Sequence, residues 1–236
     1  MRSYYSSDVS CSALDPSAWD REYGISMRLP TSYRASPSRS LFLAEAIIGP
    51  ITGNNILDVG CGLGRNTRYL SAKNWVHGID FSKVALERLA YAAINRDSLT
   101  LSYSCHDALE HNSLFSNRFN IVLDSYFSCH LIDSQLMRNW VENAAKYLTP
   151  RGLLISFGFS SADEYYQNYL HRSGEGLIVS DDKRTRIAKR IDTGMSILSF
   201  YDQFEPIFIQ EHRFSDLTKD GIFRRSILVT VLRRRW

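Results

Sequence analysis

The sequence lacks any apolar run of about 18 residues, so we expect no helix that crosses a membrane. Its first residues, MRSYYSSDVS, contain no apolar stretch of the kind found in a signal peptide. The four cysteines are scattered, and neither a Cys-x-x-Cys nor a His-x-x-x-His pair occurs. A structural zinc or iron–sulfur site is therefore not expected, and we predict no metal. We also expect reduced thiols and a cytoplasmic protein.

A large excess of charge of one sign is also missing. The net charge of +3 over 236 residues is too small to indicate a nucleic-acid-binding protein by itself. The chain has no strongly basic stripe and no Asn-Pro-Pro-Tyr-type motif, which argues against nucleic acid as a partner. The length and the hydrophobic fraction of 44% suit one globular domain with a substantial core.

What the chain does have is a regular alternation of strand-like and helix-like segments. We predict strands over 56–59, 76–79, 99–105, 119–123 and 153–159, and helices over 37–48, 66–72 and 82–94 and from 133 or 134 to about 148. This alternation is typical of a parallel sheet covered by helices on both faces. Two late strand-like runs, 207–214 and 222–232, are joined without room for a helix and predict an antiparallel pair. The predicted fold class is α/β, a Rossmann-like seven-stranded mixed sheet with its last strand antiparallel.

Two further segments fit within the same domain, which we predict to span 1–236. Residues 1–36, rich in Ser, Tyr and Pro, are predicted to form an arm or lid. The polar segment 160–204 is predicted to be an insertion on the substrate side, helical in part. We expect its basic run, RIAKR, to face solvent.

The stretch ILDVGCGLGRNT places Gly60, Gly62 and Gly64 directly after a predicted buried strand. Glycines in a strand-to-helix turn leave backbone N–H groups free to face a ligand. The Lys and Ser or Thr of a nucleotide-triphosphate loop are missing, and Arg65 stands where the dinucleotide pattern has its third glycine. The loop alone therefore indicates an anionic or nucleoside ligand.

Three carboxylates restrict the class of ligand further. Asp58, before the loop, would repel a pyrophosphate but tolerate an ammonium group. Asp80, 22 residues later in VHGIDFS, is placed to accept hydrogen bonds from both hydroxyls of a ribose. Asp107 follows the next strand, where it would accept from the exocyclic amino group of adenine. Because the carboxyl ends of neighbouring parallel strands meet at one edge, the loop, Asp80 and Asp107 are predicted to line one crevice.

At this point the sequence resembles a known family. The segments ILDVGCGLGRNT, GIDFS, CHDAL, FNIVLDSYFSCHLID and YLTPRGLLISF stand in the order of the class I S-adenosylmethionine-dependent methyltransferases. The resemblance covers roughly residues 40–160, and the two late strands match the antiparallel hairpin that ends this family's sheet. The GRNT continuation and the small size look most like the tellurite-resistance and thiopurine-methyltransferase-like branch.

The resemblance implies S-adenosylmethionine as cofactor, S-adenosylhomocysteine as its product, and a set of cofactor-binding residues. These residues are Asp58, Gly60, Cys61, Gly62, Gly64, Asp80, Phe81, Asp107, Ala108, Asp124 and Ser125. Within this set, the glycines would hold the methionine part, with Asp58 near its ammonium group. Asp80 would bind the ribose, and Phe81, Asp107 and Ala108 would surround the adenine. Asp124 and Ser125 would lie near the sulfonium and its methyl group, while Cys61 is interpreted as a small filler residue.

The substrate side leaves alternatives open. His130 is either a general base or a histidine that packs at the following helix. Trp19 and Tyr23 either fold over the cofactor as part of a lid or belong to a surface helix fixed to the core. The tyrosines Tyr126, Tyr165 and Tyr169 are candidates for a substrate pocket, with packing of the insertion as the alternative for the last two.

The leading functional hypothesis is transfer of a methyl group to O, N or S of a small molecule, such as a biosynthetic or secondary metabolite. A methyltransferase for RNA or protein is the second hypothesis, weakly favoured by the basic segments. A non-catalytic module that only binds the cofactor is the third. No motif in the sequence names the methyl acceptor.

Overall fold

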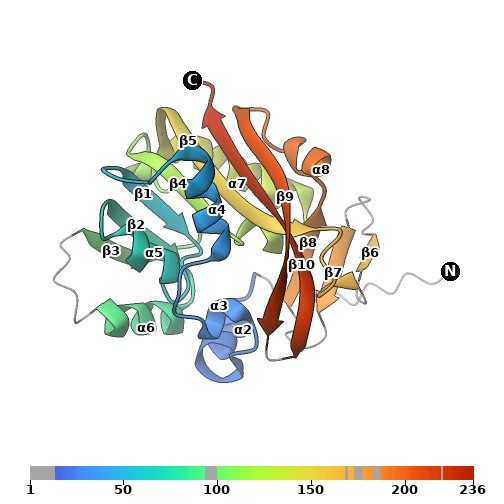
Figure 1. Cartoon of the computed structure of the whole chain (residues 1–236). Helices are drawn as coiled ribbons and strands as arrows, with labels where there is room; N and C mark the ends of the chain where they lie inside the picture. The colour runs from blue at the N-terminus through green and yellow to red at the C-terminus, as the bar shows by residue number, and fades with distance from the viewer. Residues whose placement is uncertain (1–13, 94–99, 168–169, 173–177, 183–186, 219) are drawn as a thin grey trace.

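The computed structural model describes residues 14–93, 100–167, 170–172, 178–182, 187–218 and 220–236 (Figure 1). Its helices and helical turns are α2 (Pro16–Arg21), η1 (Glu22–Ser26), α3 (Pro30–Tyr33), α4 (Arg39–Ile48), α5 (Arg65–Leu70), α6 (Lys83–Ala93), η2 (Ser113–Phe115), η3 (Ser128–His130), α7 (Ser134–Tyr147) and α8 (Gly194–Leu198). Its strands are β1 (Asn55–Val59), β2 (Trp75–Asp80), β3 (Leu101–Cys105), β4 (Phe119–Ser125), β5 (Leu148–Ser160), β6 (Leu170–Arg172), β7 (Ile178–Asp182), β8 (Ile187–Asp192), β9 (Phe204–Thr218) and β10 (Gly221–Arg234).

The centre of the molecule is one mixed sheet. Strands β3, β2, β1, β4 and β5 lie side by side in that order and are parallel. Strand β10 pairs antiparallel with β5 and with β9, which closes this part of the sheet. The sequence-based prediction of a mixed α/β sheet with an antiparallel last strand is confirmed. Because β1 lies between β2 and β4, the crevice at its carboxyl end is the place where open α/β sheets bind ligands.

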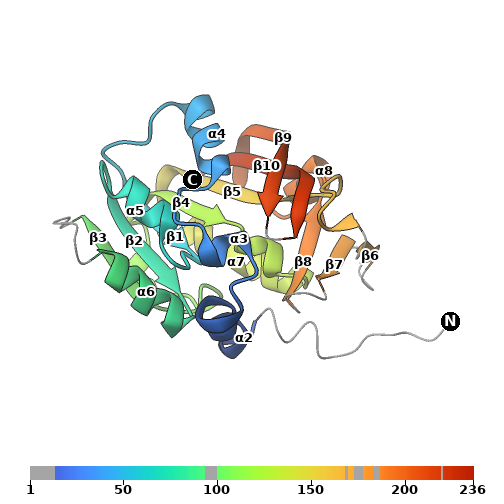
Figure 2. The same cartoon turned by 60° about the horizontal axis from the view of Figure 1, so that its bottom comes forward.

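The segment after β5 forms more strand than expected. Strands β8, β7 and β6 continue the sheet on the side opposite β3 (Figure 2). They begin where Phe159 of β5 pairs with Ile191 of β8. Among the described residues of this segment, α8 is the only α-helix. The prediction that the insertion is helical in part therefore holds only for this short helix. The basic run does not face solvent as expected, because Lys189 and Arg190 are each only 1% exposed.

Both faces of the sheet are covered. Neighbouring strand residues point to opposite faces, so Ile56 packs in the cluster beneath α4 and α5, whereas Leu57 packs in the cluster beneath α7 and α8. Trp140 of α7 is fully buried in the second cluster. This two-sided burial explains why the β1 sequence is a nearly continuous apolar run interrupted only by Asp58.

The arm before α4 is docked against the rest of the protein. Asp20 accepts hydrogen bonds from the Ser82 hydroxyl (2.6 Å) and the Val84 N–H (3.3 Å), at the start of α6. Glu22 is buried and accepts from the N–H groups of Arg28 (2.7 Å) and Leu29 (2.6 Å), which fixes the turn before α3. In both views α2 and α3 lie between α6 and the β9–β10 hairpin. No helix of the described residues is long and apolar enough to span a membrane.

Candidate active site

A cavity of about 380 Å³ lies at the carboxyl ends of the parallel strands. Gly60, Asp80 and Asp107, which follow or end three neighbouring strands, contribute to one side of it. The arm contributes Trp19 and Tyr23, which are 7% and 4% exposed. Their rings stack on each other with centroids 5.6 Å apart. The arm therefore forms a wall of the cavity and separates part of it from solvent.

The glycine loop has the backbone that its sequence requires. Gly60, Gly62 and Gly64 have φ angles of +61°, +54° and +69°, a region that other residues rarely adopt. A Cβ atom at Gly62 would lie 2.6 Å from the Tyr23 hydroxyl oxygen, so the arm approaches the loop too closely for a side chain. The loop thus presents bare backbone at the start of α5.

We expect Gly64→Ala to lower the free energy of unfolding by about 2–4 kcal/mol, because the new methyl group overlaps Leu89 and the residue keeps a positive φ. Urea denaturation measures this change. Gly158→Ala is the matched control: no atom lies within 4 Å of its Cβ position, and no positive φ is required. Equal stability of the two variants would contradict the interpretation that Leu89 and the left-handed turn exclude a side chain.

Two buried carboxylates, Asp80 and Asp58, hold the glycine loop and the start of α5 in place through hydrogen bonds. Asp80 accepts from the Gly62 N–H and the Ser82 N–H, each at 2.8 Å, and burial raises its pKa to about 6. Asp58 accepts from the Thr67 hydroxyl at 2.6 Å, and burial raises its pKa to about 7. Asp80 lines the cavity, whereas Asp58 is only 1% exposed and does not. Asp80 is therefore the carboxylate of the pair that can meet a ligand directly.

The end of β4 and the loop after it contain the residues expected near the reacting groups. Asp124 is fully buried and accepts from the N–H groups of Phe127 and Ser128, each at 3.0 Å. Asp124 supports this loop through these hydrogen bonds and does not itself line the cavity. Tyr126 has φ +66°, and its hydroxyl is hydrogen-bonded to Ser40 of α4. His130 lines the cavity edge-on to Trp19, with ring centroids 4.8 Å apart.

The structure brings most of the predicted residues to one cavity. Those that line it are Trp19, Tyr23, Gly60, Asp80, Phe81, Asp107, Ala108, Ser125, Tyr126 and His130. Those placed behind it are Asp58, Cys61, Gly62, Gly64, Asp124 and Tyr165. Tyr169 lies outside the described residues. No cluster of three or more metal-ligating side chains occurs in the part of the chain that the structure describes.

Several charged residues that line the cavity were not predicted from the sequence. Arg34, Arg39, Arg65, Lys189, Asp216 and Arg225 also line the cavity. Arg65 is recognisable only as the residue that follows the glycine loop. For Arg225 the only signal is its place near the start of the last strand, which runs antiparallel and so begins at the carboxyl end of β5. The remaining residues come from the arm, α4, β8 and β9, where no local motif marks them.

Comparison with known proteins identifies the class. Residues 56–152 match the family model described as a methyltransferase domain. A comparison with curated protein sequences gives no match. The matched range begins at Ile56 of β1 and ends at Gly152 of β5, so it contains the glycine loop and both acidic strand ends of the cavity.

Several solved structures share the fold at low sequence identity. The Burkholderia thailandensis 1,6-didemethyltoxoflavin-N1-methyltransferase, with bound 1,6-didemethyltoxoflavin and S-adenosylhomocysteine, is 17% identical with a TM-score of 0.71, over 99% of this chain and 93% of that one. The N-methyltransferase NodS of Bradyrhizobium japonicum, in complex with S-adenosylhomocysteine, is 15% identical with a TM-score of 0.64, over 93% and 100%. An S-adenosylmethionine-dependent methyltransferase of Methanosarcina mazei is 18% identical with a TM-score of 0.66, over 84% and 98%.

The matched domain and the fold agree with the motifs. Residues 56–152 form a methyltransferase domain, and the chain has the fold of the S-adenosylmethionine-dependent methyltransferases. This confirms the enzyme class predicted from the sequence.

Proposed function

We propose that this enzyme transfers the methyl group of S-adenosylmethionine to an O, N or S atom of a small molecule. The observation that carries the proposal is the cavity of about 380 Å³, whose walls come from the glycine loop on one side and from the arm and hairpin on the other. Such a walled cavity suits a small acceptor better than the exposed surface of a macromolecule. The toxoflavin methyltransferase, with its bound small substrate, supports the same choice.

The residues at the strand ends fit the cofactor. Bare backbone at Gly60, which lines the cavity, leaves room for the methionine part, and Gly62 lets Tyr23 of the arm pack against the loop. Asp80 faces the cavity with oxygen atoms that can also accept from the ribose hydroxyls. Phe81, Asp107 and Ala108 line the same side, where the adenine is assigned. Ser125 lines the cavity beyond β4, on the side assigned to the methyl group.

The bound cofactor supplies an electrophilic methyl group on a sulfonium. The protein then has to hold the acceptor in line with that methyl group and exclude water. Trp19 and Tyr23, with the arm 1–36, and the insertion 160–204 are assigned to this enclosure within one domain spanning 1–236. His130 is assigned as the base that accepts the acceptor's proton, where the acceptor is a hydroxyl or an ammonium group.

Two finer points belong to the same proposal. The GRNT continuation of the loop and the chain length support a place near the tellurite-resistance and thiopurine-methyltransferase-like branch. Cys61, Cys105 and Cys129 are free thiols, which supports a reducing, cytoplasmic environment.

The acceptor class is tested by incubating the protein with S-adenosylmethionine carrying a tritiated methyl group and with a cell extract. We expect label in acid-soluble compounds, resistant to ribonuclease and protease, and products heavier by one methylene in the mass spectrum. Label found only in RNA or protein would overturn the small-molecule proposal.

The assignment of Asp80 is tested by calorimetry. We expect Asp80→Ala to weaken binding of S-adenosylhomocysteine by about 1.5–3 kcal/mol, or roughly 10- to 150-fold, because two hydroxyls lose a charged acceptor and the Gly62 N–H loses its partner. Asp216→Asn is the matched control, since Asp216 is a carboxylate on the opposite wall of the same cavity. Similar losses in both variants would contradict the assignment.

A further inference from the structure

The cavity has a side that the cofactor assignment leaves unused. The carboxyl ends of β4 and β5, the paired ends of β9 and β10, and the segment from α3 to α4 form it. We call this side the acceptor half. Its aromatic lining residues are Phe42, Tyr126, Phe159, Tyr166 and Phe214.

The aromatic rings of the acceptor half favour a flat ligand. Tyr126 and Phe159 stack with centroids 5.0 Å apart and an interplanar angle of 25°. Tyr166 meets Phe159 edge-on at 4.7 Å. Aromatic faces and edges arranged in this way pack well against another ring system.

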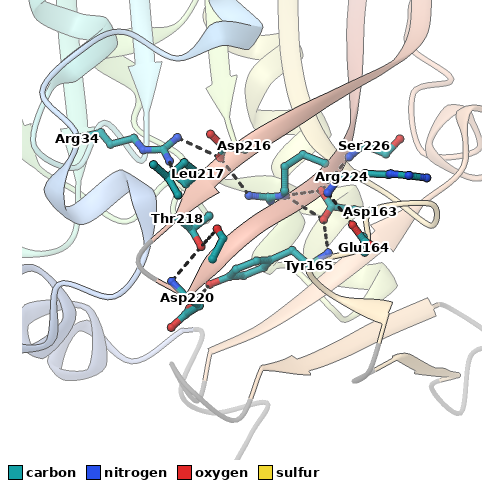
Figure 3. Close-up of polar contacts among 12 residues, drawn as sticks. Arg34, Asp163, Glu164, Tyr165, Asp216, Leu217, Thr218, Asp220, Arg224 and Ser226 are labelled. Carbon is teal, nitrogen blue, oxygen red and sulfur yellow. Dashed lines mark hydrogen bonds and ion pairs between the residues drawn. The ribbon is translucent and has the colours of Figure 1, made fainter.

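Two of the arginines in this half are already neutralised by carboxylates. Arg34 pairs with Asp216 at 3.1 Å, and Arg225 lies 3.6 Å from the same carboxylate and 3.0 Å from Asp163. Figure 3 shows Arg34 and Asp216 at one end of this network and Asp163, which also accepts from the Ser226 N–H, at the other. These arginines have little charge left to offer a ligand.

Arg65 differs from them. Its side chain is half-buried and lines the cavity, but no carboxylate or hydrogen-bond acceptor of the described residues pairs with it. Burial lowers its pKa and the nearby charge of Arg34 lowers it further, while Tyr126, Tyr23 and Asp58 act in the opposite direction. Arg39 adds a second positive charge to this half, over the ring of Phe214 at 4.5 Å. Asp58 lies near Arg65 but forms no ion pair with it, and a desolvated guanidinium without a paired anion is costly, so an anion from a ligand would stabilise it.

We propose that the methyl acceptor is a planar aromatic molecule with an anionic oxygen group, and that Arg65 binds this group. The inference rests on the proposed function, because it assigns the acceptor half of the same cavity. A guanidinium presents paired N–H donors that match a carboxylate or a phosphate. The rings of the acceptor half then hold the aromatic part, and the anion fixes which atom of that part faces the cofactor.

The test uses pairs of aromatic probes of similar shape, one member anionic and the other neutral. Benzoate, 2-naphthoate and 2-naphthyl phosphate are compared with benzamide, 2-naphthamide and 2-naphthol for binding to the enzyme saturated with S-adenosylhomocysteine. We expect at least one acid to bind the wild-type complex about 10- to 100-fold more tightly than its neutral partner. A carboxylate preference and a phosphate preference distinguish the two kinds of anion.

Two variants identify the residue that causes the preference for the anionic probe. Arg65→Gln should reduce it to about threefold or less, with the affinity for S-adenosylhomocysteine unchanged. Arg68→Gln is the control, because Arg68 lies on the same helix, donates to the Gly64 carbonyl and does not line the cavity. It should retain the preference.

Three results would overturn the inference: acids that bind no better than their neutral partners, a preference that survives in Arg65→Gln, or a loss of S-adenosylhomocysteine affinity in Arg65→Gln. The last result would assign Arg65 to the cofactor's carboxylate. If wild-type protein does not bind S-adenosylhomocysteine at all, the proposed function itself fails, and this inference fails with it.

Discussion

Replacing His130 by Ala should lower turnover by roughly 10²–10⁴-fold, the usual contribution of a positioned base. The residue lies in η3, directly after the loop that ends β4, and its ring is oriented by an edge-on contact with Trp19. It lines the cavity on the side where Ser125 and Tyr126 also face the interior. An imidazole at that position can take the proton of a hydroxyl as the methyl group is transferred, or the proton of an ammonium group before the resulting amine attacks.

The measurement is single-turnover methyl transfer to the acceptor that the wild-type enzyme methylates. His106→Ala is the matched control, since His106 lines the cavity on the cofactor side and contacts the Glu110 carbonyl at 3.0 Å. It should change turnover by less than about threefold. Wild-type turnover in His130→Ala would show that positioning of the acceptor is sufficient.

The strand order is predictable because each central strand carries its own local signal. Strand β1 reads as an apolar run and the glycine loop marks its end, so these few residues are enough to locate the crevice. The late hairpin was also predicted, although β9 and β10 extend further than the runs 207–214 and 222–232. The missed ends of β9 combine the buried Phe204 and Thr218 with exposed residues such as Glu205 and Leu217, so their hydrophobicity does not follow the period-two pattern on which the prediction depended.

The insertion is harder to predict, because burial in it does not follow hydrophobicity. In β8 the buried residues include Lys189 and Arg190 as well as Ile187 and Ile191. Arg190 is compensated by Asp192 at 2.8 Å and by the Leu131 carbonyl at 3.1 Å. A sequence pattern cannot distinguish such a strand from a solvated charged segment, since burial here depends on partners such as Leu131 that lie far away in the chain.

The two sides of the cavity also differ in how well the sequence predicts them. The cofactor side is built from residues next to strand ends, so a motif of a few residues locates Asp80 or Asp107. The acceptor half is assembled from residues distant in sequence: Arg34 and Asp216 are 182 positions apart. Such contacts depend on how the arm and hairpin pack, and no local pattern encodes them. The chemistry of the acceptor half therefore follows from the tertiary structure and not from any motif.

The ion-pair network that links Asp163, Arg225, Asp216 and Arg34 gives the largest expected effect on stability. We expect Asp163→Ala to lower the free energy of unfolding by about 3–5 kcal/mol, because it leaves the buried Arg225 without its main partner. The Arg225 Nε lies 3.0 Å from both carboxylate oxygens, and the N–H groups of Tyr165 and Ser226 also donate to them. A single truncation thus leaves several buried donors unpaired.

Urea denaturation with an unchanged m-value measures the loss. Glu205→Ala is the control, because its ion pair with Arg233 is long (3.9 Å) and exposed, and should contribute at most about 1 kcal/mol. The double variant Asp163→Leu with Arg225→Met removes both charges together and should recover most of the lost stability. If Asp163→Ala costs no more than Glu205→Ala, the buried network does not stabilise the wall of the acceptor half. If the double variant is as unstable as Asp163→Ala, the cost comes from lost packing and from the unpaired N–H groups of Tyr165 and Ser226, and not from the unpaired charge.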